Sequence, residues 1–354
     1  MPDQRRPSGE SRQLRLASRG SPLARYQAAL VADLLRRADP SVDVVVEIVR
    51  TEGDRQATVP LDRIGGQGIF TKEIQAAVLD GRADVAVHSA KDLPSVTPDG
   101  LVLAAVPERA DPRDALVGHR LTDLPAGAVV ATGSARRRAQ LANLRPDLTF
   151  VDLRGNMATR LARAVDGSVD AVVAAAAALD RLGWDGAPVD RLPVSVLLPQ
   201  AGQGALALEG RAGDDATLAL LARVDDVAAH RAVRAERAML AAVEGSCSVP
   251  VAAWAEPADP SVGGSGSAID AGGPIRLHGL LASGDGRVVV RAALTGDDPD
   301  ALGRELARYL LEDCGGRSVE GWVVEGWTGG EHSGGEHSGG EHSGGARAGG
   351  ETAR

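Results

Sequence analysis

The stretch that decides the fold is AVVATGSARRRAQLANLRPDLTFVDLRGNMATRLARAVDGSVDAVVA, residues 128–174. Short apolar runs rich in valine and alanine alternate in it with segments of helical periodicity. Strands are expected at 128–131, 150–153 and 171–174, and helices at 136–144 and 159–165. This alternation predicts an α/β domain with a mostly parallel sheet.

The same alternation is present nearer the N-terminus. Strands are expected at 14–17, 42–50 and 84–88, and helices from Ser21-Pro22 to about 37 and from 71 to 79. Proline in the first turn of the first helix agrees with this assignment. Because ligands of such sheets bind beyond the carboxyl ends of the strands, the loops after these strands are the place to look for a site.

Beyond Gly210 the pattern changes to that of a small α+β domain. Residues 214–243 are largely helical, a hairpin of 276–282 and 288–294 turns at Ser283–Gly286, and a helix over 299–314 follows. The polar residues 1–13 predict a disordered leader. From Gly329 the chain repeats Gly-Gly-Glu-His-Ser three times, which predicts a solvated tail and not a metal site.

Composition narrows the class of protein. A length of 354 residues favours two or three domains. A net charge of −9 and only 2% aromatic residues argue against a nucleic-acid binder. The longest apolar run, 171–179, is too short to cross a bilayer, and the start has no signal-peptide pattern, so a cytoplasmic protein without a membrane segment is expected. In that compartment Cys247 and Cys314 are expected to be free thiols.

Arginine is concentrated between residues 134 and 163. Seven arginines stand there against two acidic residues, an excess of +5 in an acidic protein. This excess indicates either a pocket for an anion or a solvated helix face, and the count does not separate them. Two loops in this region, Thr132–Arg137 and Arg154-Gly155-Asn156 with Arg160, each follow a strand and open a helix. Free backbone N–H groups and arginines there suit carboxylates or phosphates, so the pair of loops indicates a polyanionic ligand.

Two further positions carry candidate chemistry. Lys91-Asp92 follows the strand 84–88 and is either an acid/base or charge-stabilising pair or a surface ion pair. Cys247 lies in a turn-like loop, 244–250. Its thiol is either a nucleophile, a covalent anchor or an inert part of the core. Cys314, at a helix end, is expected to be inert. The residues alone leave these alternatives open.

Eight motifs in order along the chain resemble the porphobilinogen deaminase family. They are RLASRGSPLA (15–24), GGQGIFTKE (65–73), VHSAKDLP (87–94), ERADPRDA (108–115), Gly133-Ser134, RGN (154–156), LPQAGQGA (198–205) and the Cys247 loop. The resemblance implies two α/β domains like type II periplasmic binding proteins, facing each other across a cleft, plus a smaller α+β domain that carries the cofactor loop. It places domain 1 at 14–107 with 205–222, domain 2 at 108–204, the third domain at 223–326 and the tail at 327–354.

The resemblance also implies an activity. Such a transferase joins four porphobilinogen molecules into hydroxymethylbilane and releases ammonia, with no metal, nucleic-acid or membrane partner, as a monomer. A dipyrromethane cofactor would be held on Cys247 by a thioether, and Asp92 would stabilise the positive charge that develops as ammonia leaves. Further cofactor contacts are expected from Lys91, Ser134, Arg136, Arg137 and Arg160. Substrate contacts are expected from Arg19, Ser21, Thr132, Arg154, Gly155 and Gln203.

The chain departs from the family pattern at two positions. Gln67 stands where many members have lysine, and Gly133 where many have serine. A non-enzymatic binding protein for small anions would account for the arginine loops but not for the Cys247 loop. A regulatory or nucleic-acid-binding module is disfavoured by charge and by the scarcity of aromatic residues.

Overall fold

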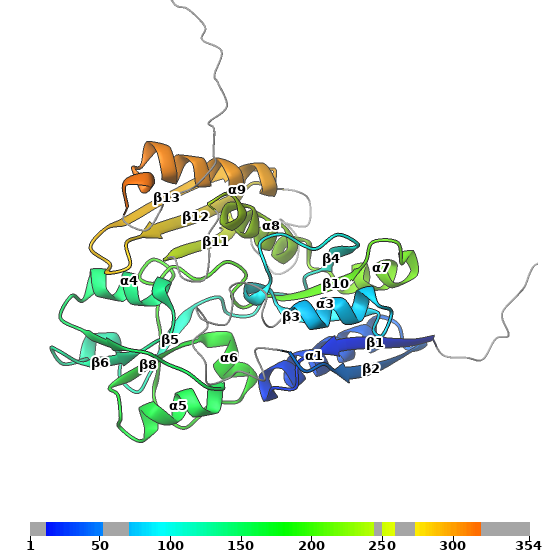
Figure 1. The fold of residues 1–354 in the computed structure, drawn as a ribbon, viewed down its shortest axis with the longest axis horizontal. Helices are drawn as coiled ribbons and strands as arrows, with labels where there is room; N and C mark the ends of the chain where they lie inside the picture. The colour runs from blue at the N-terminus through cyan, green and yellow to red at the C-terminus, as the bar shows by residue number, and fades with distance from the viewer. Residues whose placement is uncertain (1–11, 52–70, 244–249, 259–272, 320–354) are drawn as a thin grey trace, which may run out of the picture. The chain divides into compact units, whose positions relative to one another are not determined.

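The computed structural model describes residues 12–51, 71–243, 250–258 and 273–319. Within them the strands form two five-stranded sheets and one three-stranded sheet (Figure 1). Residues 1–11 of the expected leader, the expected tail, Gln67 and Cys247 lie outside the described residues. Arg12 and Gln13, expected to belong to the disordered leader, instead begin the strand Arg12–Ser18.

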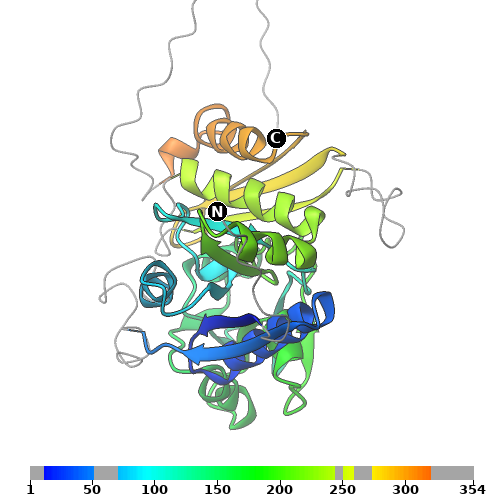
Figure 2. The same ribbon diagram turned by 90° about the vertical axis from the view of Figure 1, so that its right-hand side faces the viewer.

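The first sheet has the strand order β2-β1-β3-β10-β4. Its elements are β1 (Arg12–Ser18), β2 (Val42–Ile48), β3 (Val85–Ser89), β4 (Leu101–Ala105) and β10 (Leu206–Arg211), with helices α1 (Pro22–Ala38), α3 (Lys72–Leu79) and α7 (Asp215–Leu221). The helix α1 packs on β1 and β2, as Figure 2 shows, and buries Val31 and Leu35 against Leu14 and Leu16. These four side chains are fully buried, so burial of apolar surface holds this layer together.

The second sheet has the strand order β7-β6-β8-β5-β9. It contains β5 (Asp114–Val117), β6 (Val129–Ala131), β7 (Thr149–Val151), β8 (Ala171–Ala175) and β9 (Val189–Arg191), with helices α4 (Ala135–Leu144), α5 (Met157–Val165) and α6 (Ala176–Arg181). Both loop-to-helix junctions singled out in the sequence are N-capped. Ser134 caps α4 and Asn156 caps α5, each by accepting from a backbone N–H three residues ahead.

The sheets are mostly parallel, as expected, but each is mixed, because four strands share one direction and the fifth opposes them. In each, one inner strand runs antiparallel to both of its neighbours, namely β10 between β3 and β4, and β5 between β8 and β9. These two strands enter their sheets after the chain has crossed from the other sheet, so no helical crossover within the sheet forces the parallel direction. The short strands β4, β5, β9 and β10 were absent from the sequence prediction.

The two crossing connections, 106–113 and 192–205, lie against each other. The amide of Ala110 donates to the carbonyl of Gly204 at 3.3 Å. Gly204 has a φ of +88°, and a Cβ there would lie 2.4 Å from the Ala110 oxygen. Only glycine fits this close backbone approach, which fixes the register of the two connections.

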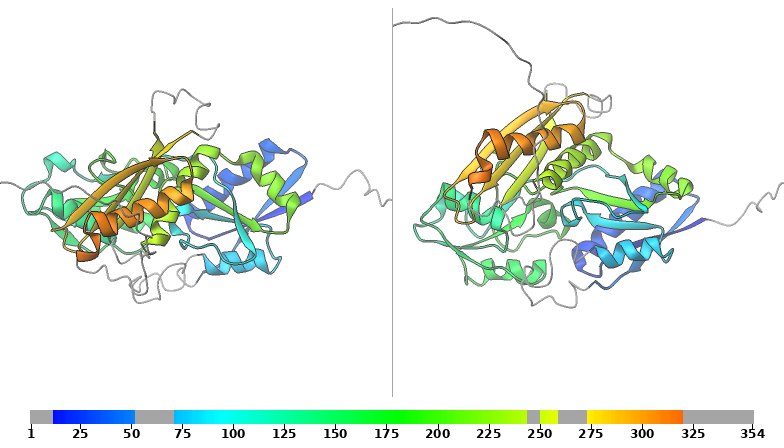
Figure 3. Two further views of the ribbon diagram at one scale, coloured as in Figure 1. Left: turned by 90° about the horizontal axis from the view of Figure 1, so that it is seen from above. Right: turned by 45° about the horizontal axis from the view of Figure 1, so that its top comes forward.

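The third sheet consists of β11 (Val251–Pro257), β12 (Ile275–Ala282) and β13 (Val289–Gly296), all antiparallel. Helices α8 (Val227–Ala242) and α9 (Pro299–Arg308) cover one of its faces, and α9 runs alongside the β12–β13 hairpin (Figure 3). The two helices cross closely at Gly303, where a Cβ would lie only 2.5 Å from the Ala235 carbonyl oxygen. The absence of a side chain at Gly303 therefore permits this close crossing. The expected hairpin and α+β class of this domain are confirmed.

The architecture thus confirms the expected fold class of two α/β domains and a smaller α+β domain. Among the described helices, none combines the length and the apolar character that crossing a bilayer requires. The described His, Cys, Asp and Glu side chains form no group of three arranged as a metal would require.

Candidate functional site

The strand β3 ends in the short helical turn Ala90–Asp92, which presents Lys91 and Asp92 in succession. Lys91 is partly buried and Asp92 is exposed. Asp92 lines a depression together with Arg19 and Ser21, which lie in the short connection between β1 and α1. The structure therefore brings together three expected site residues that lie up to 73 positions apart.

Gln203 connects Lys91 to the second sheet. Its side-chain oxygen accepts from Lys91 Nζ at 3.3 Å, while its amide nitrogen donates to Asp114 Oδ1 at 2.9 Å and to the Pro112 carbonyl at 2.8 Å. Gln203 is completely buried and sits on the connection that leads into β10. It was expected as a lining residue, and its contacts place it between the lysine and the arginines.

Asp114 is the buried anion on which the arginines converge. Arg137 donates to Asp114 Oδ1 from Nε at 2.9 Å and from Nη2 at 2.7 Å, and Arg136 Nη1 lies 2.8 Å from Oδ2. Arg136 and Arg137 also donate to the carbonyls of Leu198 and Val173. The two arginines hold the pKa of the Asp114 carboxyl far below its usual range although burial opposes them. Asp114 lies within the motif ERADPRDA, but no role was expected for it from the sequence.

These groups leave a surplus of positive charge. Lys91, Arg136 and Arg137 contribute three positive charges and Asp114 one negative charge, so the balance is +2. Burial lowers the pKa of Lys91 to about 8, with Arg137 acting in the same direction and Asp92 opposing it. A largely buried cationic surplus of this kind suits an anionic ligand whose carboxylates or phosphates can accept from these side chains.

The loop after β7 adds a second group. Arg160 Nε donates to the Gly155 carbonyl at 2.8 Å, and Gly155 has a φ of +96°. Burial lowers the pKa of Arg160, Arg137 and Arg154 add to this effect, and Asp92 opposes it. Arg160 thus lies close enough to Arg137, Arg154 and Asp92 for their charges to change its pKa.

The loop after β6 explains one departure from the family pattern. Thr132 Oγ1 accepts from the Ser134 amide at 3.2 Å, and Ser134 Oγ accepts from the Arg137 amide at 3.4 Å. Between them, a Cβ at Gly133 would lie 2.9 Å from the Leu153 carbonyl oxygen. A serine at this position would require the loop after β6 to move away from the loop after β7.

The chain is similar to porphobilinogen deaminases over most of its length. The family model described as "Porphobilinogen deaminase, dipyromethane cofactor binding domain" matches residues 14–219, and that of the "Porphobilinogen deaminase, C-terminal domain" matches residues 230–312. The porphobilinogen deaminase of Roseiflexus sp. strain RS-1 is 48% identical over 309 residues, which cover 86% of this chain and 97% of that protein. That of Bacillus subtilis strain 168 is 41% identical over 305 residues, which cover 85% and 93%.

The chain belongs to the porphobilinogen deaminase family. Porphobilinogen deaminases are hydroxymethylbilane synthases, transferases that polymerise porphobilinogen into hydroxymethylbilane in tetrapyrrole biosynthesis with a dipyrromethane cofactor. Among solved structures, the chain is similar to the VFT2 domain of Bordetella pertussis BvgS, at 19% identity and a TM-score of 0.36 over 60% of this chain and 85% of that one.

Proposed function

We propose that this chain makes hydroxymethylbilane in a cleft whose two sides are the Arg19–Ser21–Asp92 group and the Asp114-centred arginine group. The observation that carries the proposal is the surplus of +2 formed by the buried Arg136 and the partly buried Lys91 and Arg137 next to an exposed carboxylate. The surplus suits the carboxylates of pyrroles, and the carboxylate suits their N–H groups and the cation formed on loss of ammonia.

The cofactor fits the donor set on the arginine side. Lys91, Ser134, Arg136, Arg137 and Arg160 would hold its carboxylates, and Cys247 would anchor it by a thioether. When bound, the dipyrromethane supplies the pyrrole carbon to which the first substrate is joined. Because Asp114 already pairs with Arg136 and Arg137, these arginines are fixed in position before any ligand arrives, which lowers the entropic cost of binding.

The substrate side is completed by residues on both domains. Arg19, Ser21 and Arg154 would receive the acetate and propionate groups of porphobilinogen, and Thr132, Gly155 and Gln203 would line the same space. Asp92 would accept from the pyrrole N–H and oppose the positive charge as the amine leaves as ammonia. An ionised carboxylate acts in this way only when its position is fixed, and the helical turn Ala90–Asp92 provides that fixation.

The proposal includes the domain division of the chain. Domain 1 comprises 14–107 with 205–222, domain 2 comprises 108–204, and the cofactor-carrying domain comprises 223–326. The strands of the three sheets fall within these three parts and support the division. A monomer in the cytoplasm, without nucleic acid or membrane, is proposed with it.

The decisive experiment is the substitution Asp92→Asn, measured as hydroxymethylbilane formed at saturating porphobilinogen. We expect a folded protein with at least a 10²-fold loss of turnover, since the amide keeps the shape but not the charge. Asp99→Asn, the same change on an exposed residue of the following segment, is the control and should be silent. If Asp92 forms only a surface ion pair with Lys91, turnover stays normal and stability changes by about 0–1 kcal/mol. That result would remove Asp92 from the mechanism.

A further inference from the structure

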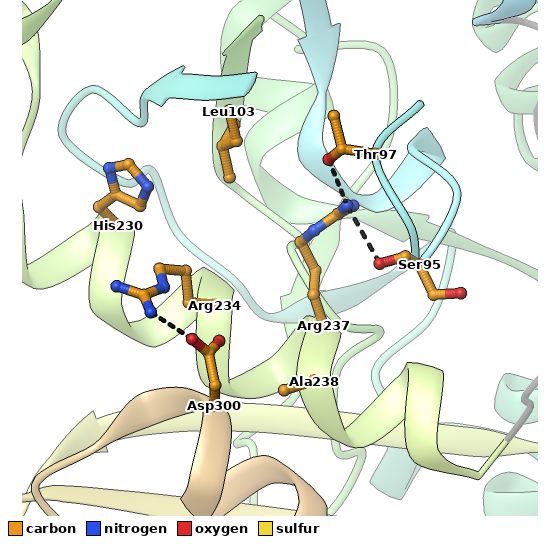
Figure 4. A pocket seen from close by; sticks show the side chains of 8 residues that line it. All are labelled: Ser95, Thr97, Leu103, His230, Arg234, Arg237, Ala238 and Asp300. Atoms are coloured by element: carbon orange, nitrogen blue, oxygen red, sulfur yellow. Dashed lines mark hydrogen bonds and ion pairs between the residues drawn. The ribbon is translucent and has the colours of Figure 1, made fainter. Parts of the chain in front are cut away.

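A second depression lies apart from the cleft residues, between the segment that follows Asp92 and the helix α8 (Figure 4). Its walls come from residues 95–103, from α8 and from the start of α9. The polar residues that line it are Ser95, Thr97, His230, Arg234, Arg237 and Asp300.

Arg237 is the unusual member of this group. It is only 8% exposed, and its Nη2 donates to the Ser95 carbonyl at 3.2 Å and to Thr97 Oγ1 at 3.4 Å. Among the described residues no carboxylate forms an ion pair with it, and its buried Nη1 has no hydrogen-bond partner there. A guanidinium stays charged when buried, and a buried charge without a counter-ion is strongly destabilising.

Glu209 is the acidic group that acts against burial to raise the pKa of Arg237, but it does not form an ion pair with it. Glu209 is fully buried, and its Oε2 accepts from Gln75 at 2.9 Å and lies 3.2 Å from His88 Nε2. Burial lowers the pKa of Arg237 in spite of the opposing effect of Glu209. Glu209 Oε2 is thus engaged with Gln75 and His88, Oε1 has no hydrogen-bond partner among the described residues, and neither oxygen forms an ion pair with Arg237 there. The depression is therefore where a counter-ion for Arg237 could bind.

The other lining residues favour an anion as well. Arg234 pairs with Asp300, and His230 Nδ1 lies 2.8 Å from Asp225 Oδ1, which leaves its Nε2 for a ligand. Two arginines against one aspartate give the lining a charge of +1 with the histidine neutral. Thr97 adds a hydroxyl that can donate, so charged and neutral donors surround the same space.

We propose that this depression is a binding site for a small oxyanion, a carboxylate or a phosphate, held by Arg237, Arg234 and Thr97. The site is separate from the deaminase cleft and goes beyond the catalytic reaction. The depression lies between the segment that follows Asp92 and the helix α8. In sequence, α8 directly precedes the Cys247 loop. An anion bound here would therefore stabilise the junction between the parts of the chain that carry these two residues.

The test uses the full chain loaded with cofactor, so that ligand carboxylates already occupy the cleft. Thermal stability is followed as inorganic phosphate or succinate replaces chloride at constant ionic strength, which gives a dissociation constant for each anion by linkage. Arg237→Met removes the buried charge but keeps the volume. Arg308→Met removes an exposed arginine of α9 outside the depression and is the matched control.

We expect at least one anion to bind wild type and Arg308→Met equally, and to bind Arg237→Met roughly tenfold or more weakly. Without the anion, Arg237→Met should be at least as stable as wild type. Crystals soaked in selenate should show an anomalous peak at Arg237. An unchanged phosphate and succinate response in Arg237→Met, or selenate confined to the cleft, would overturn the proposal. If Arg237→Met does not fold, Arg234→Gln takes its place, and an unchanged response in that variant overturns the proposal equally.

Discussion

Arg109, on the connection from β4 to β5, donates two hydrogen bonds to the fully buried carboxylate of Glu236 on α8, at 2.6 and 3.1 Å. The same carboxylate accepts from the amides of Gly202 at 2.7 Å and Ala255 at 2.8 Å. Arg109 in turn donates to the Gln203 carbonyl at 3.0 Å. The Glu236 side chain thus forms hydrogen bonds with both crossing connections and with strand β11 of the third sheet.

We expect Glu236→Gln to destabilise the protein by about 3–5 kcal/mol, since it leaves the buried Arg109 without a counter-charge. The measurement is denaturant unfolding of the variant against Glu305→Gln, which changes an exposed glutamate on α9. If both variants lose the same small amount, the bond between Glu236 and the connections contributes little to stability.

Cys247 is expected to carry the cofactor, because among the two cysteines only Cys247 lies in the family's loop motif. Intact-mass analysis should find the protein heavier than its sequence by two linked pyrrole units. Cys247→Ala should lose that excess and all activity, whereas Cys314→Ala should keep both. Added mass that persists in Cys247→Ala would contradict the assignment.

Asp114→Asn is expected to harm the cofactor-free protein more than the loaded one. The substitution leaves Arg136 and Arg137 without their buried counter-charge, which should cost about 3–5 kcal/mol, and ligand carboxylates should return part of it. The stability gained on cofactor loading should therefore be larger in Asp114→Asn than in wild type. Asp147→Asn, which breaks the exposed pair with Arg145, is the control and should leave that gain unchanged. Equal gains in both variants would contradict the role given to Asp114.

Arg154→Leu and Arg145→Leu should fail in opposite ways. Arg154 belongs to the proposed substrate contacts. Its substitution removes a charge-assisted hydrogen bond worth roughly 1.5–3 kcal/mol and should therefore reduce turnover or cofactor assembly. Arg145 bonds to Asp147 and to the carbonyls of Leu121 and Leu124, so its loss should lower stability but not turnover. Activity assays and unfolding curves of both variants separate the two effects. Equal loss of turnover in both would indicate a diffuse positive field without discrete contacts.

Lys91 should make cofactor assembly sensitive to pH. Its pKa is about 8 in the folded protein against an ordinary value of 10.5, so its charge is lost as pH rises through about 8. The rate of cofactor assembly by cofactor-free protein should fall above this pH, and Lys91→Arg, which stays charged, should not show that fall. A profile that is identical in both proteins would exclude Lys91 as its source.

The lowered pKa of Lys91 also makes stability depend on pH: activity is expected to fall as pH rises through about 8, whereas the stability of the folded chain is expected to rise. Between about pH 8 and 10.5 the unfolded chain binds more protons at Lys91 than the folded chain does. The destabilisation caused by burying this lysine is therefore complete below pH 8 and diminishes as pH rises. Lys91→Met should accordingly raise the free energy of unfolding of the cofactor-free protein at pH 7 while abolishing activity.

Local sequence determined most of the elements of this protein. Alternating apolar runs and helical periodicity predicted β1, β3, β6 and β8 and the helices α1, α3, α4 and α5, because periodicity acts over a few residues. The strands β5 and β10, of four and six residues, were not predicted, because no helical segment alternates with them as it does with β6 and β8. Their antiparallel direction depends on the chain crossing between sheets, which no local pattern records.

The candidate site divides in the same way. Motifs along the sequence pointed to Lys91, Asp92 and the arginines, because the types of residue a polyanion needs are visible one by one. Only the tertiary structure decided that Gln203 bonds both Lys91 and Asp114, across 112 and 89 positions of the chain. A buried charge must be matched by whichever group the fold brings within about 3 Å, and sequence separation does not determine that distance.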